Sequence, residues 1–104
     1  MPRYLIVRKF SVTETEMPRI GKKSKTVGRG IPGIVWEHSH VIVDENGMAG
    51  TYCVYEAPDE QTVREHAQQL GEHEYWIQEI VGDVTPDDFP LDGETAPSAP
   101  SHSH

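Results

Sequence analysis

Apolar residues recur with two different periods along the chain up to residue 81, and these periods mark strands and helices. Short runs rich in β-branched and aromatic residues predict strands at 3–10, 34–43, 51–56 and 76–81. Apolar residues at helical spacing predict helices at 17–28 and 58–71, each with a proline near its start and a glycine at its end. The periodicity therefore predicts an α+β domain.

The order of these elements, β-α-β-β-α-β, is that of the ferredoxin-like fold. In this fold a four-stranded antiparallel sheet carries both helices on one face. Val63, His66, Ala67 and Leu70 form the apolar stripe of the second helix, so we expect it to pack on the sheet. The first helix carries glycine and serine on its apolar side and is expected to pack less deeply.

Apolar residues occupy both faces of the predicted sheet. In the first strand Leu5 and Val7 point one way, and Tyr4, Ile6 and Phe10 the other. In the second strand, alternation places Ile34, Trp36 and Ile42 opposite Val35, Val41 and Val43. Because the helices cover only one face, the other needs a cover, and a second subunit would supply it. The sequence thus predicts a homodimer, assembled as a dimeric α+β barrel.

The chain divides into a ferredoxin-like domain at 1–84 and an acidic tail rich in Pro and Ser at 85–104. The tail has too few apolar residues to offset the entropy of ordering, so we predict that it is disordered.

We expect neither a signal peptide nor a membrane-spanning segment, because the apolar runs are short. A single cysteine cannot form an internal disulfide, which favours a cytoplasmic protein.

Charge is unevenly distributed along this acidic chain, whose net charge is −8. Lysine and arginine concentrate in residues 1–29, whereas the acids concentrate after them. The basic cluster lacks interleaved aromatic residues, and no strand carries the stacking aromatics of an RNA-binding sheet. We therefore expect no nucleic-acid partner and no membrane partner.

The hairpin around Asn46-Gly47 decides which side chains share a face. A two-residue turn would place His40 opposite Cys53 and His38 opposite Tyr55, which groups two imidazoles with a thiol. A three-residue turn with a bulge would shift the pairing of the two strands by one residue, and so change which side chains share a face. Cys53 would then share a face with Val41, Ser39 and Glu37 instead.

Imidazole, thiolate and carboxylate groups near this hairpin are candidate metal ligands. The alternative is that His38 and His40 are ordinary surface residues of an edge strand and that Cys53 is a small buried hydrophobe. His66 lies on the inward stripe of the second helix, where it is either a neutral core residue or a ligand or general base. The sequence leaves these alternatives open.

Two sequence segments resemble a family of small bacterial proteins of unassigned domain function, some of which are described as nickel-binding. The stretches 52–58 (Tyr-Cys-Val-Tyr-Glu-Ala-Pro) and 63–67 (Val-Arg-Glu-His-Ala) carry the resemblance, with Trp36-Glu37 upstream and the opening residues 1–8. It covers roughly residues 1–82. The resemblance implies a ferredoxin-like fold, a homodimer and nickel binding through histidine-rich sites. By position, His66 matches the helix histidine, Glu37 the acid after the strand aromatic, and Cys53 the strand cysteine.

Together these features favour a non-enzymatic homodimer that binds a divalent transition metal, without excluding an enzyme. The candidate ligands are His66, His38, His40, Glu37 and Cys53. Imidazole suits nickel, copper and zinc alike, so the choice of nickel comes from the resemblance.

The alternative hypothesis is a dimeric barrel that binds a small organic ligand, as in monooxygenase-like or isomerase-like enzymes. His66 would then act as a base. The aromatic residues that would line its pocket are Trp36, Tyr52, Tyr55 and Trp76.

Overall fold

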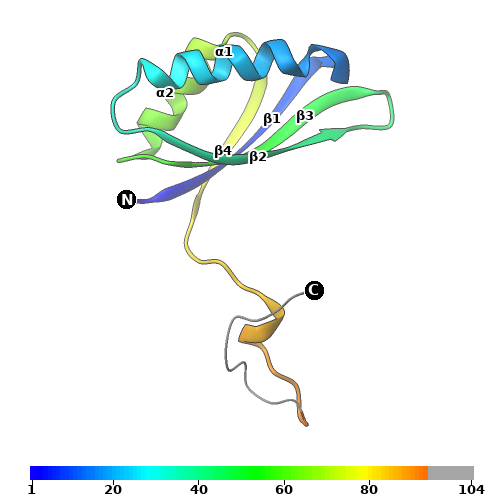
Figure 1. Cartoon of the computed structure of the whole chain (residues 1–104), viewed down its shortest axis with the longest axis vertical. Helices are drawn as coiled ribbons and strands as arrows, with labels where there is room; N and C mark the ends of the chain where they lie inside the picture. The colour runs from blue at the N-terminus through cyan, green and yellow to red at the C-terminus, as the bar shows by residue number, and fades with distance from the viewer. Residues whose placement is uncertain (94–104) are drawn as a thin grey trace.

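Four antiparallel strands form one sheet with two helices on one face, as the computed structural model shows for residues 1–93 (Figure 1). The strands are β1 (Arg3–Thr13), β2 (Val35–Val43), β3 (Met48–Glu56) and β4 (Glu74–Ile80). The helices are α1 (Met17–Arg29) and α2 (Glu60–Leu70), with 3-10 turns η1 (Glu14–Glu16) and η2 (Pro86–Asp88). The strand order β2-β3-β1-β4 confirms the predicted ferredoxin-like fold.

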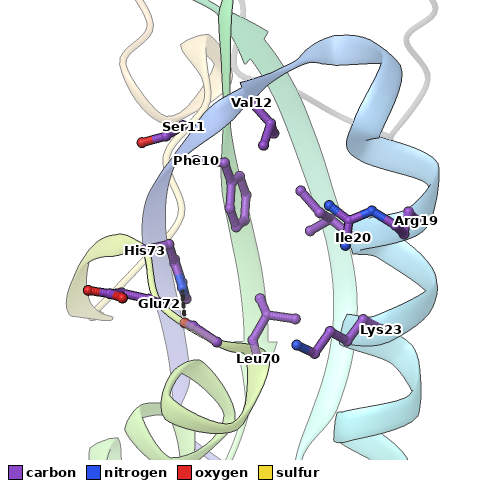
Figure 2. A pocket seen from close by; sticks show the side chains of 10 residues that line it. Phe10, Ser11, Val12, Arg19, Ile20, Lys23, Leu70, Glu72 and His73 are labelled. Carbon is purple, nitrogen blue, oxygen red and sulfur yellow. Dashed lines mark hydrogen bonds between the residues drawn. The ribbon is translucent and has the colours of Figure 1, made fainter.

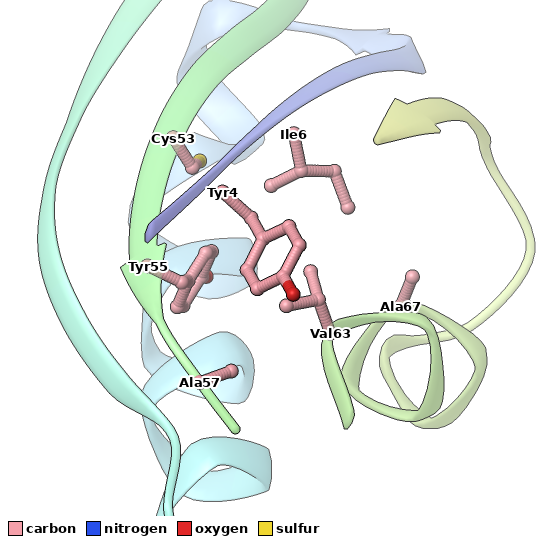
Figure 3. Packing of buried hydrophobic residues seen from close by; sticks show 7 residues of the cluster. All are labelled: Tyr4, Ile6, Cys53, Tyr55, Ala57, Val63 and Ala67. Atoms are coloured by element: carbon pink, nitrogen blue, oxygen red, sulfur yellow. The ribbon is translucent and has the colours of Figure 1, made fainter. Parts of the chain in front are cut away.

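The helix α2 is well defined at both ends and packs on the sheet. The Asp59 carboxylate accepts a hydrogen bond from the backbone N–H of Thr62 at 2.9 Å, which caps the first turn. Gly71 ends the helix with a φ of 117°. The predicted apolar stripe is buried, and the core between this helix and the sheet consists of Tyr4, Ile6, Cys53, Tyr55, Ala57, Val63 and Ala67 (Figure 3).

The helix α1 packs less deeply, as its small residues predicted. Ser24 is its one buried residue, and an added Cβ at Gly21 would meet nothing within 4 Å, whereas one at Gly28 would contact the His66 ring at 3.8 Å. Open cavities therefore remain along α1.

The β2–β3 hairpin closes with a three-residue turn. The strand pairing expected for a two-residue turn is therefore wrong. Gly47 adopts a φ of 79°, and the Asp44 side chain accepts hydrogen bonds from the backbone N–H groups of Asn46 and Met48. Cys53 consequently pairs with Ser39, and His40 pairs with Tyr52. The sequence alone could not choose, because either turn accommodates Asn-Gly.

A bulge at Glu37 changes the parity of β2 a second time. Trp36 pairs with Tyr55, whereas His38 pairs with Val54, so Glu37 is the extra residue. Trp36 therefore lies on the helix-covered side with Cys53, and Ile42 lies on the open side with His38. The predicted grouping of Trp36 with Ile42 was wrong, and Glu37 does not share the face of Cys53.

Neither helix covers the opposite face of the sheet (Figure 1). The strand register places apolar side chains at the centre of this face and polar side chains toward its ends and edges. Trp76, Tyr52 and Ile42 on this face are 49%, 41% and 44% exposed, with Leu5 and Val7 partly buried between them. This face is the surface that the predicted homodimer would cover, and the dimer remains a prediction.

After β4 the chain extends away from the sheet on the open side, where Thr85 and Asp88 cap the η2 turn (Figure 1). The division into 1–84 and a disordered tail also remains a prediction, and residues 94–104 lie outside the described part of the chain. No helix within residues 1–93 is long and apolar enough to cross a membrane.

We expect Gly50→Ala to lower the free energy of unfolding by about 1–3 kcal/mol. An added Cβ at this position would lie 2.6 Å from the backbone oxygen of Arg8, on the neighbouring strand, and that backbone cannot move freely. Urea denaturation would measure the effect. Gly82→Ala is the matched control, since its Cβ would meet nothing within 4 Å, and it should leave the midpoint nearly unchanged.

Candidate functional site

A buried arginine between two histidines forms the most distinctive polar cluster of the fold. Arg8, at an inward position of β1, is 2% exposed. Its Nη1 donates to Nε2 of His73 at 2.8 Å, and its Nη2 donates to Nδ1 of His66 at 3.1 Å. The cluster therefore joins β1 to α2 and to the loop that follows α2.

The hydrogen bonds fix the protonation of both imidazoles. Arginine only donates, so the ring nitrogens that face it must carry lone pairs. His66 donates through its Nε2 to the backbone oxygen of Ser24 at 3.0 Å, and His73 donates through its Nδ1 to the backbone oxygen of Gly71 at 2.8 Å. Both histidines are thus neutral, with their second nitrogen already bonded.

Burial and the arginine together oppose protonation of these histidines. Burial, with a smaller contribution from the positive charge of Arg8, lowers the pKa of His66 to about 4 despite the opposing hydrogen bond to Ser24. Burial likewise lowers the pKa of His73, again with a contribution from Arg8. Neutral imidazoles can act as hydrogen-bond acceptors or bases, but here their lone pairs face Arg8.

The aromatic residues Tyr55 and Phe10 enclose this cluster. The Arg8 guanidinium lies 5.9 Å from the ring centre of Tyr55, within the range of a cation–π contact. Phe10 stacks on His73 with ring centres 5.1 Å apart. Burial raises the pKa of the Tyr55 phenol.

Three cavities border the cluster along α1. One, of about 290 Å³, has Phe10 and His73 on one side and Arg19 and Lys23 of α1 on the other (Figure 2). A second, of about 230 Å³, lies between α1 and the strands β2 and β3, and Arg8 lines it. The third, of about 280 Å³, is lined by Ser24, Trp36, Tyr55 and His66 among others.

The other candidate histidines lie apart from this cluster. His38 and His40 are exposed on the open face of the edge strand β2, with ring centres 5.5 Å apart in an edge-to-face arrangement. Both project from the same side of the strand because they are two residues apart. They form a pair of accessible imidazoles.

The remaining candidate ligands are engaged elsewhere. Glu37 pairs with Arg3, at 2.9 Å between Oε2 and Nε, and this bond lowers the pKa of the carboxyl. Cys53 is buried on the helix-covered face, and its thiol donates to the Thr51 hydroxyl at 3.3 Å. No group of three or more His, Cys, Asp or Glu side chains is placed to hold a metal ion among residues 1–93.

The aromatic set predicted for a ligand pocket is divided between the two faces. Trp36 and Tyr55 line cavities on the helix-covered side. Tyr52 and Trp76 lie on the open face, where each flanks Val7 of β1. One pocket cannot therefore contain all four side chains of a single chain.

Sequence reasoning missed Arg8 as a site residue. Strand alternation carried the signal, because Arg8 follows Tyr4 and Ile6 at inward positions and precedes Phe10. A charged residue in an apolar series is unusual in a core. The link to His73 had no signal, since that contact joins residues 65 positions apart.

The neutral His66 should make the fold sensitive to acid. Its folded-state pKa of about 4 lies below the ordinary value of 6.5, so the unfolded chain binds the proton first as the pH falls. Stability should therefore be full above about pH 6.5 and fall by about 2–3 kcal/mol toward pH 4. Urea denaturation at fixed protein concentration would follow this loss.

His66→Gln should be less stable at pH 7 but should lack this part of the pH dependence, because glutamine does not titrate. His38→Gln is the matched control and should keep the wild-type slope, since that imidazole is exposed. An unchanged slope in His66→Gln would contradict the assignment.

Comparisons with known proteins give a family and a fold. A family model described as "Nickel responsive protein SCO4226-like" matches residues 4–80. No curated protein matches the chain. Among solved structures, the de novo designed protein Foldit4 has a TM-score of 0.50 at 13% identity, over 80% of this chain and 100% of that chain. This likeness concerns the fold alone.

Two further solved structures are similar at lower scores. SnoaB, a cofactor-independent oxygenase from Streptomyces nogalater, has a TM-score of 0.48 at 14% identity, over 82% of this chain and 97% of its own. A conserved protein from Methanosarcina mazei Go1 has a TM-score of 0.41 at 14% identity, over 75% of this chain and 92% of its own.

Proposed function

This chain belongs to the SCO4226-like family of nickel-responsive proteins, and we propose that it is a non-enzymatic homodimer that binds a divalent transition metal, nickel in the first instance. The observation that carries the proposal is the exposed pair of imidazoles, His38 and His40, on one face of β2. Imidazole nitrogen is a donor that nickel binds well.

The residues of the described chain differ in how well they fit a metal. Both ring nitrogens of His66 are hydrogen-bonded, and the adjacent Arg8 repels a cation, so we do not place His66 in the site. Cys53 lies on the opposite face from the imidazole pair, and Glu37 is held by Arg3. His38 and His40 are free of these obstacles, because they are exposed, lie on one face and accept no hydrogen bond from an arginine among residues 1–93.

Two imidazoles from one chain leave coordination positions for other donors. In the proposed homodimer, water or groups of the second subunit would complete the metal's coordination. Because both His38 and His40 lie on the open face, they border the surface that would meet the second subunit. Metal binding and assembly would then be linked, since a donor set completed across subunits stabilises the dimer.

The open face supports the dimer by its size and chemistry. It carries aromatic and β-branched side chains from all four strands, and Ile42, Tyr52 and Trp76 are each more than 40% exposed. A stable interface buries about 800 Å² on each partner, and one face of a small four-stranded sheet can supply that area. A twofold axis through this face would bring the same surface of both subunits together.

Isothermal titration with Ni²⁺ tests the metal site. The full-length protein should carry His102→Ala and His104→Ala, so that the terminal histidines do not bind the ion. In this background we expect His38→Ala and His40→Ala each to weaken binding by about tenfold or more. Ser39→Ala is the matched control between them, because Ser39 lies on the other side of β2 beside Cys53. Equal affinity in all three variants would refute the site.

Sedimentation velocity tests the dimer. We expect a dimer at micromolar concentration, and Trp76→Glu should convert it to a monomer by placing a charge in the apolar interface. The matched control is Val43→Glu, a similarly exposed position (47%) on the helix side of β2, which should remain dimeric. A monomeric wild-type protein would exclude this assembly.

A further inference from the structure

The Arg8 guanidinium is a buried charge with no acidic partner. It is 2% exposed, and none of the four ion pairs among residues 1–93 includes it. Its two imidazole partners are neutral, so they satisfy hydrogen bonds but do not balance the charge. Burying an unpaired charge is strongly unfavourable even after relaxation, and the contact with the Tyr55 ring offsets only part of this cost.

An open cavity borders this charge. The cavity of about 230 Å³ lies between α1 and the sheet, and Arg8 is the one charged residue that lines it. Its walls are mostly apolar, with Phe10, Ile20, Trp36 and Val41 among them. The hydroxyls of Ser24, Ser39 and Thr51 and the thiol of Cys53 are the polar groups.

The surroundings of the cavity are cationic. The helix α1 carries five basic residues and no acid over Met17–Arg29. The adjoining cavity in Figure 2 shares Phe10, Ile20 and Leu70 with this one and places Arg19 and Lys23 beside it. Glu72 also lines that cavity and Arg19 is paired with Glu16, so the excess of positive charge comes mainly from the lysines of α1. This excess raises the local concentration of anions, although the chain as a whole is acidic.

We propose that the cavity between α1 and the sheet binds a small monocarboxylate with a flat apolar body, whose carboxylate contacts Arg8. A single buried cation matches a single negative charge, and a phosphate dianion would remain half unpaired among apolar walls. The planar guanidinium matches the geometry of a carboxylate. Trp36 and Phe10 would contact the apolar body of a one-ring acid, the size that this volume admits.

This site is independent of the proposed metal site. His38 and His40 lie on the open face of the sheet, whereas the cavity lies on the helix-covered face. A His38→Ala/His40→Ala double variant should therefore bind the carboxylate as the wild-type protein does. The two proposals can fail separately.

Titration calorimetry with benzoate and its uncharged isostere benzamide tests the proposal. High salt should be used so that attraction to exposed lysines is screened. We expect benzoate to bind at least about tenfold more tightly than benzamide, because only the acid pairs with the buried charge. Equal affinity for the two compounds, or no binding of either, would overturn the proposal.

Gly21→Leu locates the site. Gly21 lines the cavity from α1, and a Cβ there meets nothing within 4 Å, so a leucine side chain would extend from the helix into the cavity. It should abolish benzoate binding while the fold persists by circular dichroism. Thr26→Leu, which adds an apolar side chain on the exposed face of the same helix, should bind benzoate normally. Undiminished binding in Gly21→Leu would place the anion elsewhere and refute the site.

Arg8→Met tests the role of the charge. Methionine fills similar space without a charge, so a folded variant should bind benzoate no better than benzamide. A retained preference for benzoate would overturn the role of Arg8. If this variant does not fold, Gly21→Leu and the benzamide comparison still decide the proposal.

Discussion

The contact of Arg8 with two neutral histidines links every layer of the helix-covered side of the fold. Through His66 the arginine is tied to α2, and through the bond from His66 to Ser24 it is tied to α1. Through His73 it holds the loop that leads into β4. Because a buried guanidinium must have its donors satisfied, these elements cannot shift independently without exposing an unpaired charge. The positions of both helices relative to the sheet depend on this cluster.

The two faces of the sheet separate two kinds of chemistry. The helix-covered face encloses a cation with neutral donors and acceptors, a setting that repels metal ions and attracts anions. The open face presents the imidazole pair and an apolar surface, a setting that can hold a borderline metal beside a second subunit. A histidine on α2 and a histidine on β2 therefore differ in availability, although the residue type is the same. Burial and hydrogen bonding, rather than residue identity, decide which of them can take a ligand.

Two extra residues, one in the β2–β3 turn and one at the bulge in β2, determine which side chains share those faces. The αL conformation of Gly47 closes a three-residue turn, which moves the side chains of β2 to the face opposite the one expected for a two-residue turn. The bulge at Glu37 reverses this change for Trp36 and Val35. Between the two, Ser39 and Val41 join Cys53, whereas His38 and His40 face the other way. Strand alternation has a period of two, so each insertion moves the side chains beyond it to the opposite face. Residue types alone carried no signal for the bulge, because a glutamate is compatible with either arrangement.

The amino-acid sequence by itself determined the element order, the stripe on α2, the shallow packing of α1 and the resemblance to a nickel-related family. These features depend on periodicity and on turn residues that act within a few positions of the chain. Only the tertiary structure revealed that Arg8 is buried, that His66 and His73 share it, and that the candidate ligands fall on two faces. Such contacts join residues far apart in sequence, and their energies depend on burial and on charge neutralisation, which local patterns do not encode. The sequence thus identifies the fold and the family, and the tertiary arrangement decides which polar groups remain available for a ligand.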